Sequence, residues 1–291
     1  MLIKYKWIML LLMTMIAFAA VSLLQGAGRS AGRADLSDPF LDPYALSLAH
    51  RHAGHGMESA SEKAVQLQIE WTGGPPQAGV HSDLSLTITN GQGELLKDFV
   101  ITNEKLMHLI VVSEDLQYFQ HIHPEYTGQG HFKVNVSFPT GGTYKLYADF
   151  LPTGMNELTR SVSVQVQGKL NQPVPLEESD SLTAHVHGMK VQLEFADKPA
   201  PGSATSMTYT FTDGKTGEPV EDLELYLGAV GHVVAIDEAL QQFIHVHPLN
   251  WASSGPQAVF GVSFPVSGTY KLWGQFRRGG VDMIIPFIVT V

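Results

Sequence analysis

Two groups of three histidines share one spacing, in which a His-x-His-Pro motif follows a third histidine 13 residues upstream. Side chains two residues apart on a β-strand project from the same face, so each His-x-His pair points one way. A hairpin turn would fold the upstream histidine alongside the pair. Three converging imidazoles form a ligand set for a borderline transition-metal ion. The first group is His108, His121 and His123, and the second is His232, His245 and His247.

The same pattern has two structural interpretations that need no metal. A His-x-His pair can lie on a solvated edge strand. His108 shares its parity with Ile110 and Val112, so it could face a core and bond only to a backbone carbonyl. The neighbours of His108 differ between the groups, since Met107 aligns with Gly231, whereas all three histidines are the same. This contrast favours the interpretation as ligands, with one ion held by each group.

A second pattern is a His-rich run that ends in Gly-Met ahead of each group. A mobile segment that carries imidazoles and a thioether can wrap a metal without a preformed cage, and the thioether selects Cu(I). A solvated polar tail is the alternative interpretation. These residues, which we expect to capture or exchange the ion, are His50, His52, His55 and Met57 in the first run and His185, His187 and Met189 in the second.

The donors available elsewhere favour copper, with zinc as the alternative. The chain has no cysteine, which excludes thiolate zinc sites, disulfides and thiol nucleophiles. The two groups share no carboxylate, because Glu125 aligns with Leu249 and Asp149 aligns with Gln275. We find no Gly-x-Ser-x-Gly, phosphate-binding or His-Glu-x-x-His motif, so the sequence predicts no catalytic residue and no organic cofactor.

The elements that must position these histidines are duplicated. Alternation of apolar and polar residues, as over 132–138, predicts about seven short strands in each repeat, which is typical of an immunoglobulin-like β-sandwich. We therefore predict an all-β protein with tandem sandwiches at 64–167 and 184–291, joined by a linker at 168–183. Three blocks recur with shifts of 126, 124 and 126 residues: Val65–Ile69 as Val191–Phe195, His108–Pro124 as His232–Pro248, and Val136–Phe150 as Val262–Phe276.

The sequence of the N-terminal region indicates that the protein is exported from the cytoplasm. Lys4 and Lys6 precede an apolar run at 7–24, which indicates a signal peptide or membrane anchor over 1–29. A polar, His-rich flexible stalk is expected over 30–63. The bulk of the chain is then secreted or anchored to the membrane only through this segment. The net charge of −10 gives no electrostatic basis for nucleic-acid binding.

With these residues in view, the chain resembles bacterial secreted proteins built from YtkA-like or FixH-like sandwich domains. The resemblance rests on the export signal, the sandwich pattern and the block at 108–124 with its copy at 232–248, and it spans residues 64–291. It implies an envelope-located metal-binding module, with relatives among extracytoplasmic copper-handling proteins. It implies no catalytic residues.

The sequence thus predicts a non-enzymatic copper-binding protein that buffers or delivers the ion outside the membrane. Two other functions stay open. One is a structural or interaction module that docks a protein partner in the envelope. The other is a metalloenzyme with three-histidine sites, for which Glu125 would be the general base in the first repeat.

Overall fold

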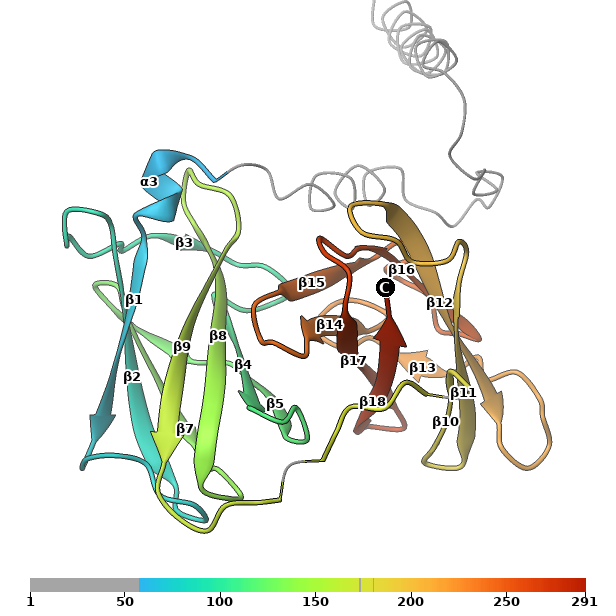
Figure 1. Cartoon of the computed structure of the whole chain (residues 1–291). Coiled ribbons are helices and arrows are strands. Elements are labelled where there is room, and N and C mark those ends of the chain that lie inside the picture. Colours follow the sequence, from blue (N-terminus) through green and yellow to red (C-terminus); the bar gives the residue numbers. More distant parts are fainter. Residues whose placement is uncertain (1–57, 173, 180) are drawn as a thin grey trace, which may run out of the picture. The chain divides into compact units, whose positions relative to one another are not determined.

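Two β-sandwiches follow each other in the computed structural model of the chain, which describes residues 58–172, 174–179 and 181–291 (Figure 1). The predicted signal or anchor at 1–29 and the run from His50 to Met57 lie outside the described residues. Within those residues, no helix combines the length and the apolar character needed to span a membrane.

The first sandwich contains a four-stranded and a five-stranded antiparallel sheet. Leu84, Leu86 and Ile88 alternate with polar residues and are fully buried in its core, as the sequence pattern predicts. The four-stranded sheet has the order β1 (Gln66–Thr72), β2 (Ser82–Thr89), β7 (His131–Val136) and β6 (Glu125–Gly128). The other sheet has the order β3 (Phe99–Val100), β8 (Gly142–Pro152), β4 (Met107–Ser113) and β5 (Phe119–Ile122), with β9 (Leu158–Val166) paired to β8.

The second sandwich repeats most of this plan, but it adds β10 ahead of the first matching strand and its two sheets are joined. Strand β15 pairs with β14 and also with β16, so it joins the two sheets into one nine-stranded path. In the first sandwich the matching segment is divided into β5 and β6. The order is β10 (Thr183–Val186), β11 (Met189–Phe195), β12 (Ala204–Asp213), β16 (Gln257–Ser263), β15 (Phe243–Pro248), β14 (His232–Asp237), β17 (Thr269–Arg278) and β13 (Leu223–Glu224), with β18 (Val281–Thr290) paired to β17.

A corner tyrosine supports the same turn in each repeat. The hydroxyl of Tyr144 donates to the carbonyl oxygen of Thr140 at 3.0 Å, and that of Tyr270 donates to Val266 at 2.9 Å. This bond ties the start of a long strand to the preceding turn, which is a feature of immunoglobulin-like sandwiches. The predicted fold class, tandem immunoglobulin-like sandwiches, is therefore confirmed.

The last residues of the expected flexible stalk form a capped helical turn, α3 (Ala60–Lys63). Ser59 accepts a hydrogen bond from the backbone of Glu62, and the Glu62 carboxylate accepts one from the backbone of Ser59, which makes a capping box. The same carboxylate accepts two bonds from Asn156, so the turn is fixed on the first sandwich. The stalk interpretation is wrong for residues 58–63, because a buried acid anchors them.

Strand β4 is buried on both faces, and this determines where the histidines lie. Met107, Leu109 and Val111 point into the core of the first sandwich. The opposite face carries His108, Ile110 and Val112, and the two aliphatic residues pack into a hydrophobic cluster that draws on both repeats. The parity predicted for His108 holds, but its face meets the other repeat and not the core of its own sandwich.

The two repeats contact each other through matching surfaces. Phe119 stacks on Trp273 with ring centroids 4.8 Å apart, and the aligned pair, Phe243 and Tyr147, stacks at 4.9 Å. Such reciprocity is typical of an isologous dimer, here formed within one chain. Two lysine bonds are reciprocal as well: Lys271 Nζ donates to the carbonyl of Leu116 at 2.8 Å, and Lys145 Nζ donates to that of Leu240 at 2.6 Å.

Candidate metal centre

The two predicted histidine groups meet at the interface between the repeats. The rings of His108 on β4 and His232 on β14 stack with centroids 5.4 Å apart and planes 19° apart. The ring of His121 lies 4.9 Å from that of His232. The groups therefore adjoin in one cluster, because the strands that carry them are central to the interface.

The first group brings its three imidazoles together. Nδ1 of His108 and Nε2 of His121 are 3.0 Å apart. One ring nitrogen each of His108, His121 and His123 lies within 4.8 Å of the other two. Nitrogens on a tetrahedral ion with bonds of about 2.0–2.1 Å are about 3.3 Å apart, so a contraction of about 1.5 Å at most would close the set.

Two rings of the group have hydrogen-bond partners outside it, and one of these partners fixes a tautomer. His108 Nε2 lies 3.0 Å from the carbonyl oxygen of Thr102, which only accepts, so Nε2 carries the proton and Nδ1 a lone pair. His121 Nδ1 lies 3.1 Å from Oε1 of Gln275, which also accepts from the hydroxyl of Tyr226. The amide of Gln275 can point either way, because its Nε2 has no hydrogen-bond partner among the described residues, so Nε2 of His121 carries either a proton or a lone pair. Nε2 of His121 and Nδ1 of His108 lie 3.0 Å apart, close enough to share a cation.

At neutral pH that cation is not a proton. Burial, followed by the charge of His245, lowers the pKa of His108 to about 4. Burial and the neighbouring His108 lower the pKa of His121 well below its usual value and that of His123 to about 4. The imidazoles are thus held neutral, which is the form that binds metals. Among the described residues, Nε2 of His123 is buried without a hydrogen-bond partner.

The second group has a different charge. Nδ1 of His245 lies 2.6 Å from Oδ2 of Asp149, and its Nε2 lies 2.8 Å from Nε2 of His232. Burial by itself lowers the pKa of His245, but the hydrogen bond and charge of Asp149, with the charge of Glu157, outweigh burial and raise it. The imidazolium form fits this geometry, because it donates to Asp149 at one end and to His232 at the other.

The most compact ligand set beside the second group includes a residue that the sequence did not indicate. Glu157, His245 and His247 each place one ligand atom within 4.8 Å of the others, and Glu157 comes from the first repeat. The predicted set of His232, His245 and His247 shares two residues with this group and stays a prediction. His232 is buried against His245, and its Nδ1 has no hydrogen-bond partner within the described part of the chain.

The second His-rich run does not form a mobile ligand segment. His185 and His187 are exposed on the hairpin between β10 and β11, while Met189 is 1% exposed in the core of the second sandwich. Strand pairing fixes His185 and Met189, His187 lies in the turn between them, and the thioether faces away from solvent. Met189 is therefore wrong as a ligand. The first run, His50, His52, His55 and Met57, lies outside the described residues and stays a prediction.

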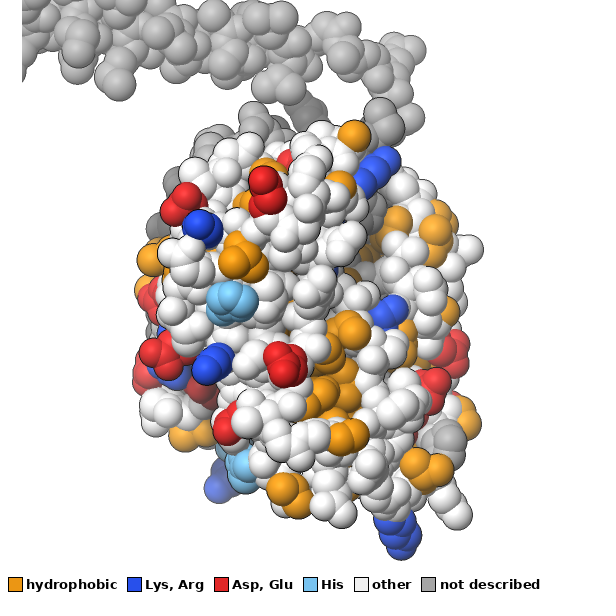
Figure 2. All heavy atoms as spheres, turned by 90° about the vertical axis from the view of Figure 1, so that its left-hand side faces the viewer, with side chains coloured by type: hydrophobic (Ala, Val, Ile, Leu, Met, Phe, Trp, Pro, Cys, Tyr) orange, Lys and Arg blue, Asp and Glu red, His pale blue; other side chains and the backbone are white. Residues whose placement is uncertain are grey.

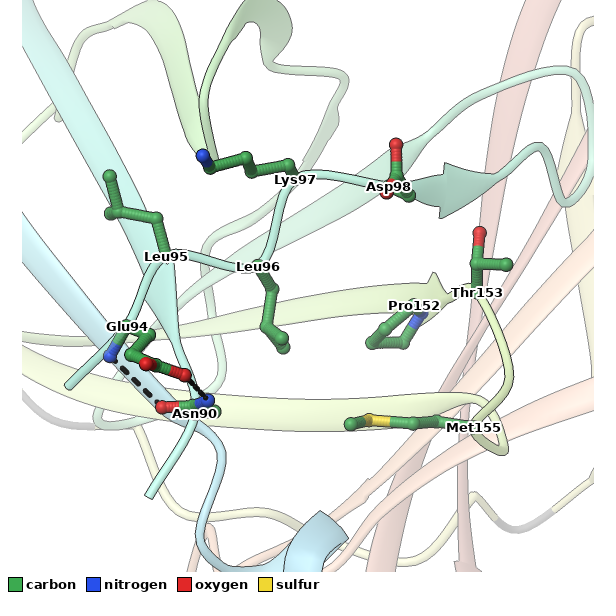
Figure 3. Close-up of a pocket in the computed structure, with 9 residues that line it drawn as sticks. All are labelled: Asn90, Glu94, Leu95, Leu96, Lys97, Asp98, Pro152, Thr153 and Met155. Carbon is green, nitrogen blue, oxygen red and sulfur yellow. Dashed lines mark hydrogen bonds between the residues drawn. The ribbon is translucent and has the colours of Figure 1, made fainter. Parts of the chain in front are cut away.

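Among the residues that the structure describes, the remaining polar features offer no comparable set. His81 bonds to Asn135 at 2.6 Å and His131 to Thr87 at 3.0 Å, as isolated partners. A cavity of about 370 Å³ near the end of β8 is lined by Asn90, which bonds to Glu94, and by none of the histidines (Figure 3). On the face shown in Figure 2, acidic and basic side chains are interspersed, and the histidines in view stand apart.

The chain shows distant likeness to several solved structures. The Escherichia coli adhesin FdeC is 15% identical with a TM-score of 0.27, over 80% of this chain and 65% of that one. Invasin, a bacterial integrin-binding protein, is 10% identical with a TM-score of 0.23, over 76% and 39%. A two-domain fibronectin type III segment of chicken tenascin is 12% identical with a TM-score of 0.22, over 77% and 98%. Scores this low support no inference about function.

The chain spans less than two thirds of the length of both bacterial structures. No curated protein matches the sequence. One family model matches twice, over residues 62–168 and 184–291, and the two matches together include well over half of the chain. The chain thus belongs to the family described as "Domain of unknown function (DUF8832)", with one copy in each sandwich.

Proposed function

We propose that this protein binds a transition-metal ion, with copper preferred and zinc as the alternative, through His108, His121 and His123. Its role is to buffer or deliver the ion outside the cytoplasm. The observation that carries the proposal is the convergence of one ring nitrogen each from His108, His121 and His123, all within 4.8 Å of one another, while Thr102 and Gln275 hold the other nitrogens of His108 and His121. A metal ligand histidine commonly donates its second nitrogen in this way.

The donor set bears on the choice of metal. The first group offers imidazole nitrogens only, and Met189 lies in the core. Without a thioether, selectivity for Cu(I) loses its support among the described residues. Nitrogen sites bind divalent ions more tightly along the series up to Cu(II), with Zn(II) below it. We therefore propose Cu(II) as the preferred ion of the first group.

Burial supports storage or transfer rather than catalysis. His108 is 1% exposed, and all three rings turn toward one another beneath the second repeat. Glu125, the candidate general base, is exposed on β6. A catalytic metal needs an open position for water or substrate, and a buried three-nitrogen set suits an ion that is held.

The test is metal analysis of the exported chain purified without a histidine tag, followed by titration with Cu(II) and Zn(II). We expect binding by the wild type and a loss of at least about 100-fold in affinity for His121→Ala and for His123→Ala. The matched control, His81→Ala, removes an exposed histidine and should bind as the wild type does.

A wild-type protein that binds neither Cu(I), Cu(II) nor Zn(II), and whose unfolding temperature none of them raises, contradicts the proposal. The interaction module of the cell envelope then becomes the better interpretation. In that case the buried histidines serve only to join the two repeats.

A further inference from the structure

We propose that Glu157 of the first repeat, together with His245 and His247 of the second, forms a second site for a divalent transition-metal ion that ties the two repeats together. This inference extends the proposed function to another ion and uses residues outside the first group. A donor set of two imidazoles and one carboxylate is a recognised set for Zn(II).

The geometry converges on one ring nitrogen. Nδ1 of His245 has Asp149 Oδ2 at 2.6 Å and Glu157 Oε1 at 3.9 Å, so two carboxylates flank it. Both carboxylates are largely buried, with side-chain exposures of 3% and 15%. A divalent cation at Nδ1 takes the place of the proton that His245 donates to Asp149, and it also offsets the repulsion between the two buried carboxylates.

The scaffold holds each ligand in place. Glu157 lies directly before β9, and the preceding residue, Asn156, donates its backbone and side-chain N–H groups to Glu62 at 2.8 and 2.9 Å. His247 lies on β15, where it pairs with Gly261 of β16. The helical turn α3 thus fixes the loop that carries Glu157, and a strand fixes the histidines.

The ligands come from opposite sides of the interface, which gives the ion a mechanical consequence. Glu157 belongs to the first sandwich, and both histidines belong to the second. An ion bound by all three residues can leave only when these ligands move apart. While the ion stays bound, the two repeats cannot separate. Binding to the folded state alone also stabilises that state by mass action.

The experiment counts Zn(II) ions by equilibrium dialysis on the untagged exported chain with His50, His52 and His55 replaced by alanine, so that the first His-rich run contributes no site; this chain is the wild-type reference below. We expect two ions in the wild type and one each in Glu157→Gln and His123→Ala. The double variant should bind none. Glu218→Gln, which neutralises an exposed glutamate, is the matched control and should keep two ions. Unfolding curves without metal establish that each variant is folded before dialysis.

The outcomes separate the two sites. If Glu157→Gln keeps two ions with wild-type affinity while His123→Ala loses one, the second site is wrong and the proposed function stands. If only Glu157→Gln loses an ion, the first site is wrong and the second stands. Zn(II) should also raise the unfolding temperature of the wild type, and Glu157→Gln should lose at least half of that rise. An unchanged rise in Glu157→Gln would overturn the claim that the ion ties the repeats.

Discussion

The two repeats carry the same three histidines, yet the two groups differ in charge. His121 directs Nδ1 to Gln275 of the second repeat, and its counterpart, His245, directs Nδ1 to Asp149 of the first. Gln275 and Asp149 occupy equivalent positions. An amide leaves the first group neutral, whereas a carboxylate favours an imidazolium in the second.

This difference teaches that identical ligands do not imply identical sites. The residue that orients each imidazole lies on the opposite repeat, so one substitution there changes the charge of the site without altering any histidine. Partners of this kind affect metal affinity nearly as strongly as the ligands themselves. The variants below exchange or remove these partners, beginning with the largest expected effect.

Removing the carboxylate of the second group should cost the most stability. In Asp149→Asn, His245 loses a buried ionic partner at 2.6 Å, and breaking a buried pair costs about 3–5 kcal/mol. The matched variant Gln275→Ala removes a neutral partner and should cost about 1–3 kcal/mol. Urea denaturation measures both free energies of unfolding. Equal losses in the two variants would mean that the repeats do not differ as described.

Acid should destabilise the protein mainly through the first group. Unfolded histidines titrate near pH 6.5, while the folded pKa values of His108 and His123 are about 4. Between these pH values the unfolded chain binds protons that the folded chain does not, so stability falls as pH falls. Each shift corresponds to up to about 3 kcal/mol lost by pH 4.

The second group should make the protein less stable as pH rises, which is opposite to the effect of the first group. The raised pKa of His245 gives stability that is full below pH 6.5 and is lost as pH rises through the folded value. Glu157, whose pKa burial and Asp149 raise to about 7, also disfavours folding as pH rises from 4.5 through 7. Urea titrations at pH 4.5, 6.5 and 8.5 test this. A stability that does not change between pH 6.5 and 4.5 contradicts the assignment for the first group.

The strands and the pairing of each His-x-His motif could be predicted from sequence because alternation reports which side chains share a face. The interface carried a weaker signal. Residues 107–112 and 232–236 are apolar without interruption apart from the histidines, as expected of strands buried on both faces. When these segments are interpreted as alternating strands, they predict two separate sandwiches and no contact between them.

Glu157 and the roles of Asp149 and Gln275 could not be predicted in the same way. Glu157 aligns with Met283, so a comparison of the two repeats does not identify Glu157 as a shared ligand. Asp149 and Gln275 differ between the repeats, which argued against a shared function, but each contacts a histidine of the other repeat. Contacts between repeats depend on how two folded surfaces dock, and spacing along the chain does not encode that.

Placing a carboxylate beside the first group should strengthen it. Gln275→Glu changes an amide to an acid of the same shape at 3.1 Å from Nδ1 of His121. A carboxylate that accepts from a ligand histidine raises the basicity of that ligand, and we expect about tenfold tighter Cu(II) binding. Calorimetric titration measures it, with Gln241→Glu as an exposed control. Weaker or unchanged binding would show that the partner does not tune the site.

The smallest effect concerns the hairpin that precedes the second sandwich. His187 and Gly188 have φ angles of +46° and +78°, so the two-residue turn is of the type that favours Asn-Gly. His187→Asn should therefore stabilise the protein by about 0.5 kcal/mol and leave metal binding unchanged. His187→Val places a β-branched residue at a positive φ and should cost about 1–2 kcal/mol. Urea denaturation and Cu(II) titration of both variants provide the test. If His187→Asn binds metal more weakly while its stability is retained, His187 is a ligand. The run that precedes the second sandwich would then have the role predicted for the run that precedes the first.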